Sequence, residues 1–406
     1  MTTADKQIAI IGGGPAGLMA AYRLCQQDGL NIHVFDQKPS VGRKFLIAGR
    51  GGLNLTNAED LESFLSRYEE GAEFLMPHIK AFSPDDLQKW AASLGIETFV
   101  GSSGRIFPKE MKATGLMRAW TKYLTSAGVQ FHLQHKWQGF TPTGDLTFTD
   151  KAGDDVSFTA DATLLAMGGA SYAHLGATGD WREHLTQSAI TVAPFAPINC
   201  GYDIQWSDHI LPKFEGAPLK NISVSLNGKS GRGDMVLTAY GMEGGALYAI
   251  SPEITRQITK TGTATIHMDL RPDFTVGNLT ARLQNRGKAS LSNHLRKKLK
   301  LSPLELALLY ELTEKESLSD PGEIARSLKS LPITFTNTRP IDRAISVMGG
   351  IALSELTDDL MLRQIPGVFA AGEMLDWHAP TGGYLLQACF STAVAAADGI
   401  LHYIQK

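Results

Sequence analysis

The sequence has little cysteine and no large excess of charge of either sign. Its three cysteines, Cys25, Cys200 and Cys389, lie far apart and no Cys-x-x-Cys pair occurs, so neither a disulfide framework nor a zinc cluster is indicated. The formal net charge is −3, which gives no overall electrostatic reason to expect a nucleic acid or an anionic membrane as partner. No uninterrupted apolar run reaches the ~18 residues of a membrane-spanning helix. We therefore expect a cytoplasmic protein that binds neither membrane nor nucleic acid.

Glycine, in contrast, is abundant. The chain has 41 glycines in 406 residues, about 10% against an average usage of ~7%, and they follow no Gly-X-Y period that would indicate collagen. Glycines mark places where the backbone turns tightly or approaches a ligand.

The length of the chain, 406 residues, predicts two or three domains.

The first 35 residues predict a βαβ unit. Residues 7–11 have the pattern of a short buried strand, residues 18–27 that of a helix, and residues 31–35 that of a second strand. This order is typical of a parallel sheet with helices on its faces.

The connection between the first strand and the helix contains a Gly-x-Gly-x-x-Gly motif. Gly12 permits the tight turn, Gly14 lets the backbone approach a pyrophosphate, and Gly17 lets the helix pack close to the strand. The helix N-terminus then offers N–H groups and a partial positive charge to the phosphates. Asp36 ends the next strand, where an acid binds ribose hydroxyls. The motif therefore predicts a dinucleotide site.

Three later glycine-rich stretches are candidates for the same ligand. Residues 41–57 contain Arg43 and Lys44, which can neutralise phosphate charge, and glycines that let the backbone approach a flat ring. Residues 168–180 begin with Gly168 after an expected strand at 162–167, where a ligand binds at the edge of a sheet. Residues 366–387 contain Glu373, an acid after a strand, and a helix start that can stabilise negative charge on a ligand ring.

The middle of the chain predicts an inserted domain. Residues 1–190 and 341–406 have α/β character, whereas residues 191–340 are rich in expected strands, with a helical segment at about 279–330. Basic residues between Arg286 and Lys300 indicate either a partner surface or, as the favoured interpretation, a solvated helix face. The fold class is thus an α/β, Rossmann-like domain interrupted by a β-rich one.

These motifs in this order resemble the FAD-binding pattern of two-dinucleotide-fold flavoproteins. More narrowly, residues 42–49, 54–57, 171–172, 176–180, 237–247, 348–351 and 367–376 resemble the bacterial aminoacetone-oxidase-type, or NAD(P)/FAD-dependent, oxidoreductases, a family that includes a bile-acid enone reductase. That family usually has Arg-Cys where this chain has Gly52-Leu53, and Ser-Gly-Pro-Ala at residues 243–246, where this chain has Glu-Gly-Gly-Ala. The chain therefore resembles a divergent subfamily with a different pocket.

The resemblance implies FAD as the cofactor and a barrel-like insertion with a small helical part. No metal is expected. The residues expected to bind the cofactor are Gly12, Gly14, Pro15, Ala16, Gly17, Asp36, Gln37, Lys38, Arg43, Lys44, Gly49, Asn54, Thr56, Gly168, Gly372, Glu373, Gly382, Gly383 and Tyr384.

The function expected from these features is hydride transfer between a small organic substrate and flavin N5. No second Gly-x-Gly-x-x-Gly follows an expected strand, so NAD(P)H would bind transiently as donor, or oxygen would act as acceptor. A flavin-dependent tRNA-modifying enzyme and a non-catalytic flavin-binding regulator are the alternatives. No catalytic residue stands out. The candidates for proton transfer are His174, His378, Tyr172 and Tyr384, and Cys389 is expected in the core.

Overall fold

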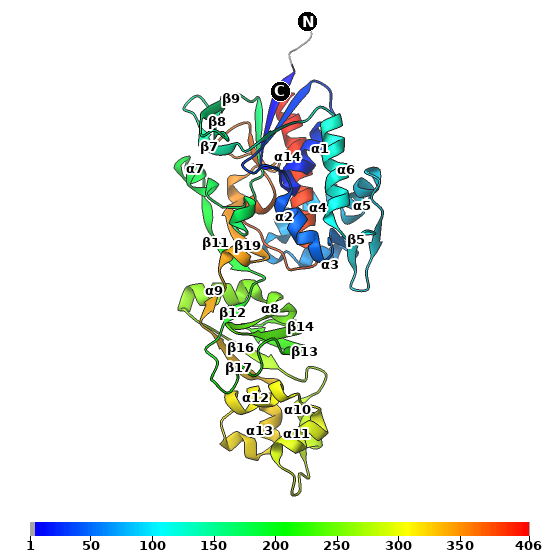
Figure 1. The fold of residues 1–406 in the computed structure, drawn as a ribbon, viewed down its shortest axis with the longest axis vertical. Coiled ribbons are helices and arrows are strands. Elements are labelled where there is room, and N and C mark those ends of the chain that lie inside the picture. The colour runs from blue at the N-terminus through cyan, green and yellow to red at the C-terminus, as the bar shows by residue number, and fades with distance from the viewer. Residues whose placement is uncertain (1–4, 406) are drawn as a thin grey trace. The chain divides into compact units, whose positions relative to one another are not determined.

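The computed structural model describes residues 5–405 and divides the chain into two compact units. Unit 1 comprises the chain up to Ala196 and from Ser346 onward, and unit 2 comprises Pro197–Ile345 (Figure 1). Unit 1 is therefore built from two separate parts of the sequence, and unit 2 from one continuous part.

A five-stranded parallel sheet forms the centre of unit 1. Its strands, in spatial order, are β20 (Val368–Ala370), β10 (Ala162–Leu165), β1 (Lys6–Ile11), β2 (Leu30–Asp36) and β6 (Gln130–Leu133). The last four residues of β1 are buried because helices cover both faces of such a sheet. The predicted βαβ unit is confirmed, although its helix α1 (Pro15–Leu24) begins directly after the glycine turn rather than at residue 18.

Helix α14 (Tyr384–Ile404) packs against α1, so the last helix lies beside the first (Figure 1). An ion pair between Arg23 and Asp398 joins the two helices. By length and apolarity α14 could span a membrane, but 67% of its most apolar window is buried within the protein. The other helices of unit 1 are α2 (Arg43–Ala48), α3 (Leu61–Ser66), α4 (Ala72–Ala81), α5 (Pro84–Ser93), α6 (Ala113–Ser126) and α7 (Trp181–Gln187).

Three small sheets complete unit 1. One contains β3 (Thr56–Asn57), β4 (Thr98–Val100) and β5 (Arg105–Pro108), and a second is a meander of β7 (Lys136–Phe140), β8 (Leu146–Thr149) and β9 (Asp155–Phe158). The third pairs β11 (Val192–Ile198) with β19 (Ser346–Ile351). The strands expected between residues 129 and 149 are present, but β6 joins the parallel sheet while β7 and β8 belong to the meander.

Unit 2 contains a seven-stranded sheet and two groups of helices. The strands, in spatial order, are β17 (Leu331–Phe335), β16 (Ala264–Asp269), β13 (Pro218–Leu226), β14 (Lys229–Thr238), β15 (Gly241–Gly244), β12 (Tyr202–Asp203) and β18 (Asn337–Thr338). The helices are α8 (Gly245–Tyr248), α9 (Ser251–Thr261), α10 (Val276–Leu283), α11 (Leu291–Leu299), α12 (Pro303–Leu312) and α13 (Pro321–Lys329). The helical segment expected at about 279–330 is divided into separate helices, because Ser290 and Ser302 cap the starts of α11 and α12.

Candidate functional site

The glycine turn lies at the carboxyl end of β1, before α1. A Cβ atom on Gly12 would lie 2.4 Å from the Ala166 carbonyl oxygen, and one on Gly17 would lie 1.9 Å from the Gly12 carbonyl oxygen, so packing requires glycine at both positions. A Cβ atom on Gly14 would meet nothing within 4 Å. Helix α1 has no side-chain cap and no acid in its first turn, which begins at Pro15. Its N-terminus is therefore open to a phosphate.

Asp36, the last residue of β2, lies beside this turn. Its Oδ2 accepts a hydrogen bond from the Gly13 N–H (2.9 Å) and its Oδ1 one from the Lys38 N–H (2.8 Å). Burial raises the pKa of the Asp36 carboxyl, and both hydrogen bonds oppose that rise. Gln37 donates to the Gly176 carbonyl (2.7 Å), which holds the loop after β10 beside the end of β2. The sequence-distant loop is thus fixed at the same sheet edge.

Lys44 connects three segments that lie far apart in the sequence. Its ammonium group donates to Oε2 of Glu373 at 2.8 Å and to the Ser171 hydroxyl at 2.7 Å. The Glu373 side chain is only 9% exposed and the Lys44 side chain 26%. A Cβ atom on Gly169 would lie 3.4 Å from the Glu373 side chain. Helix α2, the loop after β10 and the segment after β20 therefore meet at one charged cluster.

Four of the residues expected to bind the cofactor carry buried polar atoms without a partner among the described residues. These atoms are Nε of Arg43, Oδ1 of Asn54, Oγ1 of Thr56 and Oε1 of Glu373. An unsatisfied buried polar group costs about 1–3 kcal/mol, so such groups usually have a ligand or water as partner. The four groups supply both donors and acceptors, as the ribityl chain and ring of FAD require. The residues present therefore fit the cofactor.

The start of α14 packs on the segment that carries Thr56. Gly382 and Gly383 have φ angles of +139° and +98°, and a Cβ atom on Gly383 would lie 2.6 Å from the Thr56 Cα. Tyr384, the next residue, donates its hydroxyl to Glu59 at 2.9 Å. Burial and the Glu59 carboxylate raise the pKa of Tyr384 to about 12, so it stays protonated near neutral pH.

The remaining glycines expected at the site differ in their surroundings. A Cβ atom on Gly49 would lie 2.5 Å from the Ala113 Cβ, and one on Gly372 would lie 2.8 Å from the Ala16 Cβ, so both positions allow close packing within unit 1. Gly168 has open space at its Cβ position, and its carbonyl accepts a hydrogen bond from Trp181.

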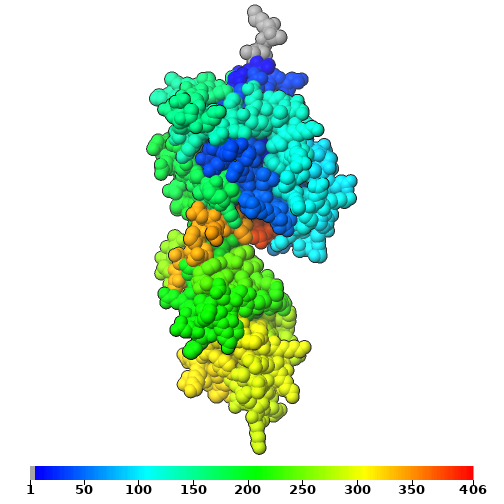
Figure 2. All heavy atoms as spheres, viewed as in Figure 1, coloured from blue at the N-terminus to red at the C-terminus, as the bar shows by residue number. Residues whose placement is uncertain are grey.

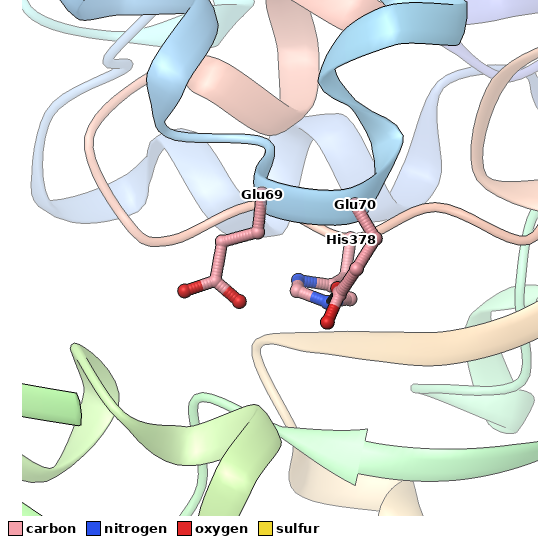
Figure 3. A group of neighbouring side chains, drawn as sticks. All are labelled: Glu69, Glu70 and His378. Atoms are coloured by element: carbon pink, nitrogen blue, oxygen red, sulfur yellow. Dashed lines mark ion pairs between the residues drawn. The ribbon is translucent and has the colours of Figure 1, made fainter. Parts of the chain in front are cut away.

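A second cluster combines an imidazole and two carboxylates. Figure 3 shows the side chains of Glu69 and Glu70 beside His378, with candidate ligand atoms of the three lying within 4.8 Å of one another. His378 Nε2 lies 3.3 Å from Glu70 Oε2; the imidazole is buried, whereas the Glu70 side chain is 62% exposed. Imidazole nitrogens and carboxylate oxygens are ligand types that bind metal ions.

Of the other candidates for proton transfer, Tyr384 is hydrogen-bonded to Glu59, whereas His174 and Tyr172 have no ion pair or hydrogen bond to a carboxylate within residues 5–405. His174 is exposed, and Tyr172 precedes it in left-handed backbone with a φ of 59°. Cys389 is buried in the core, as expected. This burial raises the pKa of its thiol.

Ser171 and Glu59 were not among the residues expected to contribute to the site. Ser171 is fully buried and accepts a hydrogen bond from Lys44. Glu59 accepts hydrogen bonds from both Tyr384 and Arg67. A signal for Ser171 exists, because it follows the Gly168–Gly169 pair by two residues. The sequence gives no comparable signal for Glu59, because acidic residues are common in polar loops.

The glycine turn, the acid at the end of β2 and the parallel sheet together define a Rossmann-type FAD-binding α/β fold, here accompanied by mixed and antiparallel sheets. The chain belongs to the HI0933-like family, because the model of the HI0933-like protein Rossmann domain matches residues 6–399.

Two curated relatives are similar over nearly the whole chain. The 3-dehydro-bile acid delta(4,6)-reductase of Clostridium scindens is 26% identical over 408 residues, covering 96% of this chain and 98% of the relative. The ribosomal RNA dihydrouridine synthase of Haemophilus influenzae is 25% identical over 404 residues, covering 96% of this chain and 97% of the relative.

Solved structures show the same fold at lower identity. The 3-ketosteroid delta1-dehydrogenase from Sterolibacterium denitrificans has a TM-score of 0.57 at 14% identity, with 100% of both chains covered. A flavocytochrome c3 fumarate reductase has a TM-score of 0.53 at 16% identity, covering 100% of this chain and 79% of the other. These likenesses concern the fold alone.

Proposed function

We propose that the protein is an FAD-dependent oxidoreductase that transfers a hydride between an organic substrate and flavin N5. The observation that carries the proposal is the cluster of Lys44, Glu373 and Ser171, with unpartnered buried polar atoms in residues expected to bind FAD. Membership of the HI0933-like family and the names of the curated relatives support it.

In this proposal the chain holds FAD along the carboxyl edge of the parallel sheet. The N-terminus of α1 binds the pyrophosphate and Asp36 binds ribose hydroxyls. Glu373 accepts hydrogen bonds from the cofactor while Lys44 compensates its charge. Gly383 and the N-terminus of α14 stabilise negative charge on the ring. Bound flavin itself supplies the redox chemistry.

The substrate class we propose is a compound with a carbon–carbon double bond conjugated to a carbonyl. By its name, the C. scindens relative reduces double bonds of a 3-dehydro bile acid, and the H. influenzae relative makes dihydrouridine. Dihydrouridine is uridine whose ring double bond, conjugated to a carbonyl, has been reduced. A small organic substrate of this type, with NAD(P)H as transient donor, is the first candidate. We also propose a cytoplasmic location, and we retain the narrower resemblance to aminoacetone-oxidase-type enzymes as part of the proposal.

The second candidate is reduction of uridine in RNA. The observation that favours it is a basic segment of unit 2, residues 274–304, that contains no Asp and no Glu. Both candidates need the same cofactor and the same hydride chemistry, and they differ in the size and charge of the substrate.

An absorbance spectrum of the purified protein tests the cofactor. A yellow protein with flavin bands is expected, and a colourless protein that cannot be reconstituted with FAD would refute the proposal. Anaerobic mixing with NADPH then tests the donor. Bleaching of the flavin band is expected, whereas a band that resists NADPH and NADH but bleaches with dithionite would exclude the NAD(P)H-linked reductase.

A further inference from the structure

A 31-residue segment of unit 2 contains many cations and no acid. Residues 274–304 include no Asp and no Glu, in a chain whose net charge is −3. They include seven basic residues, which we call the basic patch: Arg282, Arg286, Lys288, Arg296, Lys297, Lys298 and Lys300. The near-neutral charge of the whole chain therefore hides a strongly positive local region.

The structure presents all seven cations to solvent on an ordered framework. They lie on α10, on α11 and in the connections that follow these helices, and every one is exposed. The apolar residues of the same helices, among them Leu283, Leu295 and Leu299, are buried in the core of unit 2. Figure 2 shows this yellow-green to yellow segment at the surface of the unit. The helices thus hold the charges in place and leave them available to a partner.

None of the seven cations forms an ion pair with a described residue. Nearby cations outside the patch are paired: Arg271 with Glu305, and Lys329 with Asp269. Within the patch, the one aromatic contact is that of the Arg282 guanidinium, which lies 4.6 Å from the centre of the Phe274 ring. Intramolecular salt bridges therefore do not account for the charge.

Stabilisation of a helix end accounts for part of the patch only. Arg296, Lys297 and Lys298 lie in the last turn of α11, where cations interact favourably with the helix dipole. Arg286 and Lys288 lie instead in the connection between α10 and α11, where no helix end requires them. The charge extends beyond what the helices need.

A pocket opens beside the patch. Its volume is about 130 Å³, and its lining includes the patch residue Arg286, the polar Asn285 and His294, and the apolar Leu283 and Ile324. Single-stranded RNA is recognised through unstacked bases that pack on side chains while cations bind the phosphates. A pocket with both polar and apolar walls next to a row of cations suits such a base.

We infer that the basic patch is a binding surface for single-stranded RNA. An anionic membrane fits less well, because an interfacial helix inserts large exposed apolar residues. The four core leucines of α10 and α11 are buried, and Val276 and Leu291 are partly buried against the same core. The inference deepens the second proposed function by assigning the RNA to a surface, and it replaces the expectation from overall charge that the protein binds no nucleic acid. Binding is measured without turnover, so its failure is distinguishable from a failure of the flavin proposal.

The test measures RNA binding by the full-length, flavin-loaded protein. Fluorescence anisotropy of a labelled single-stranded RNA of about 20 nucleotides, which is longer than a typical single-strand site, is recorded between 50 mM and 500 mM salt. Each phosphate contact contributes about 0.7 to the slope of log affinity against log salt, so seven contacts give a slope of about −5. The variant R296Q/K297Q/K298Q should lower this slope to about −3 and weaken binding about 100-fold at 0.1 M salt.

The matched control removes three exposed cations from unit 1. The variant K112Q/R118Q/K122Q makes the same change of charge at the start and on the surface of α6, and it should bind RNA within about threefold of the wild type. Thermal melting and the flavin spectrum of each sample show whether fold and cofactor are intact. DNA of the same sequence and vesicles containing phosphatidylserine serve as competing ligands.

Weakened binding with a lowered slope in the patch variant alone supports the inference. Three outcomes would overturn it: no RNA binding by the wild type, equal loss in both triple variants, or binding of DNA or of the vesicles as tight as that of RNA.

Discussion

The ion pair between Lys44 and Glu373 should stabilise the flavin-free protein measurably. Lys44→Met keeps the aliphatic stem but removes the ammonium group that pairs with the buried Glu373 carboxylate, whose Oε1 already lacks a partner among the described residues. Removing one member of a fully buried pair costs about 3–5 kcal/mol. Because the Lys44 side chain is 26% exposed, we expect the lower end, about 3 kcal/mol.

Urea denaturation of flavin-stripped protein, followed by tryptophan fluorescence, measures this effect. Five of the six tryptophans lie in unit 1, so the signal reports mainly on the unit that contains the pair. With a slope of about 3 kcal/mol per molar urea, the midpoint of Lys44→Met should fall by about 1 M. The double variant K44M/E373M should recover most of the loss, because replacing both charges by apolar groups removes the uncompensated charge. A fall of the urea midpoint of Lys44→Met by less than about 0.2 M would refute this reasoning. It would also be refuted if the stability loss of K44M/E373M equalled the sum of the losses of Lys44→Met and Glu373→Met.

Two further predictions concern the glycine turn and the histidines of the sheet. The free energy of unfolding of Gly14→Ala should be within about 1 kcal/mol of that of the wild type. Its methyl group occupies open space at the helix N-terminus, so the variant should bind FAD at least tenfold more weakly. Gly17→Ala should instead lose about 3 kcal/mol or more of unfolding free energy, because its methyl group clashes with the Gly12 carbonyl. Thermal melting and flavin retention after desalting check both, and equal stability of the two variants would contradict it. Burial lowers the pKa of His33 and of His132, which lie in contact on β2 and β6, so the folded chain binds fewer protons than the unfolded chain. The contribution of the two histidines to the free energy of unfolding is therefore full above pH ~6.5. It falls with decreasing pH by up to about 1.4 kcal/mol per pH unit for each histidine. His132→Phe should flatten the pH dependence of the melting temperature between pH 7.5 and 5.5, and an unchanged profile would exclude this pair as its source.

The parts of the molecule that depend on sequence neighbours were predictable. The βαβ unit, the glycine turn and Asp36 lie within the first 36 residues, and each follows from a local rule of strand, turn or helix chemistry. Strand β10 was equally clear, because all of its residues except Thr163 are apolar.

The arrangement of the charged cluster was not predictable in the same way. Lys44 and Glu373 are separated by 329 positions, and no local pattern states that their side chains meet or that Ser171 joins them. The helical segment of unit 2 shows a smaller limit. The sequence predicts one helical segment at about 279–330, whereas the serine caps that divide it into helices depend on backbone geometry at single residues.

The packing of α1 against α14 has a consequence for synthesis of the chain on the ribosome. About 360 residues separate the two helices, so at about 5–20 residues per second α1 waits roughly 20–70 s for its partner. During that time β1 and the apolar face of α1 lack their cover, while unit 2, which is continuous in sequence, is already complete. The nascent first half of this protein therefore needs protection from aggregation until the last helix emerges, and a message truncated before residue 384 would yield a chain that cannot close its cofactor site.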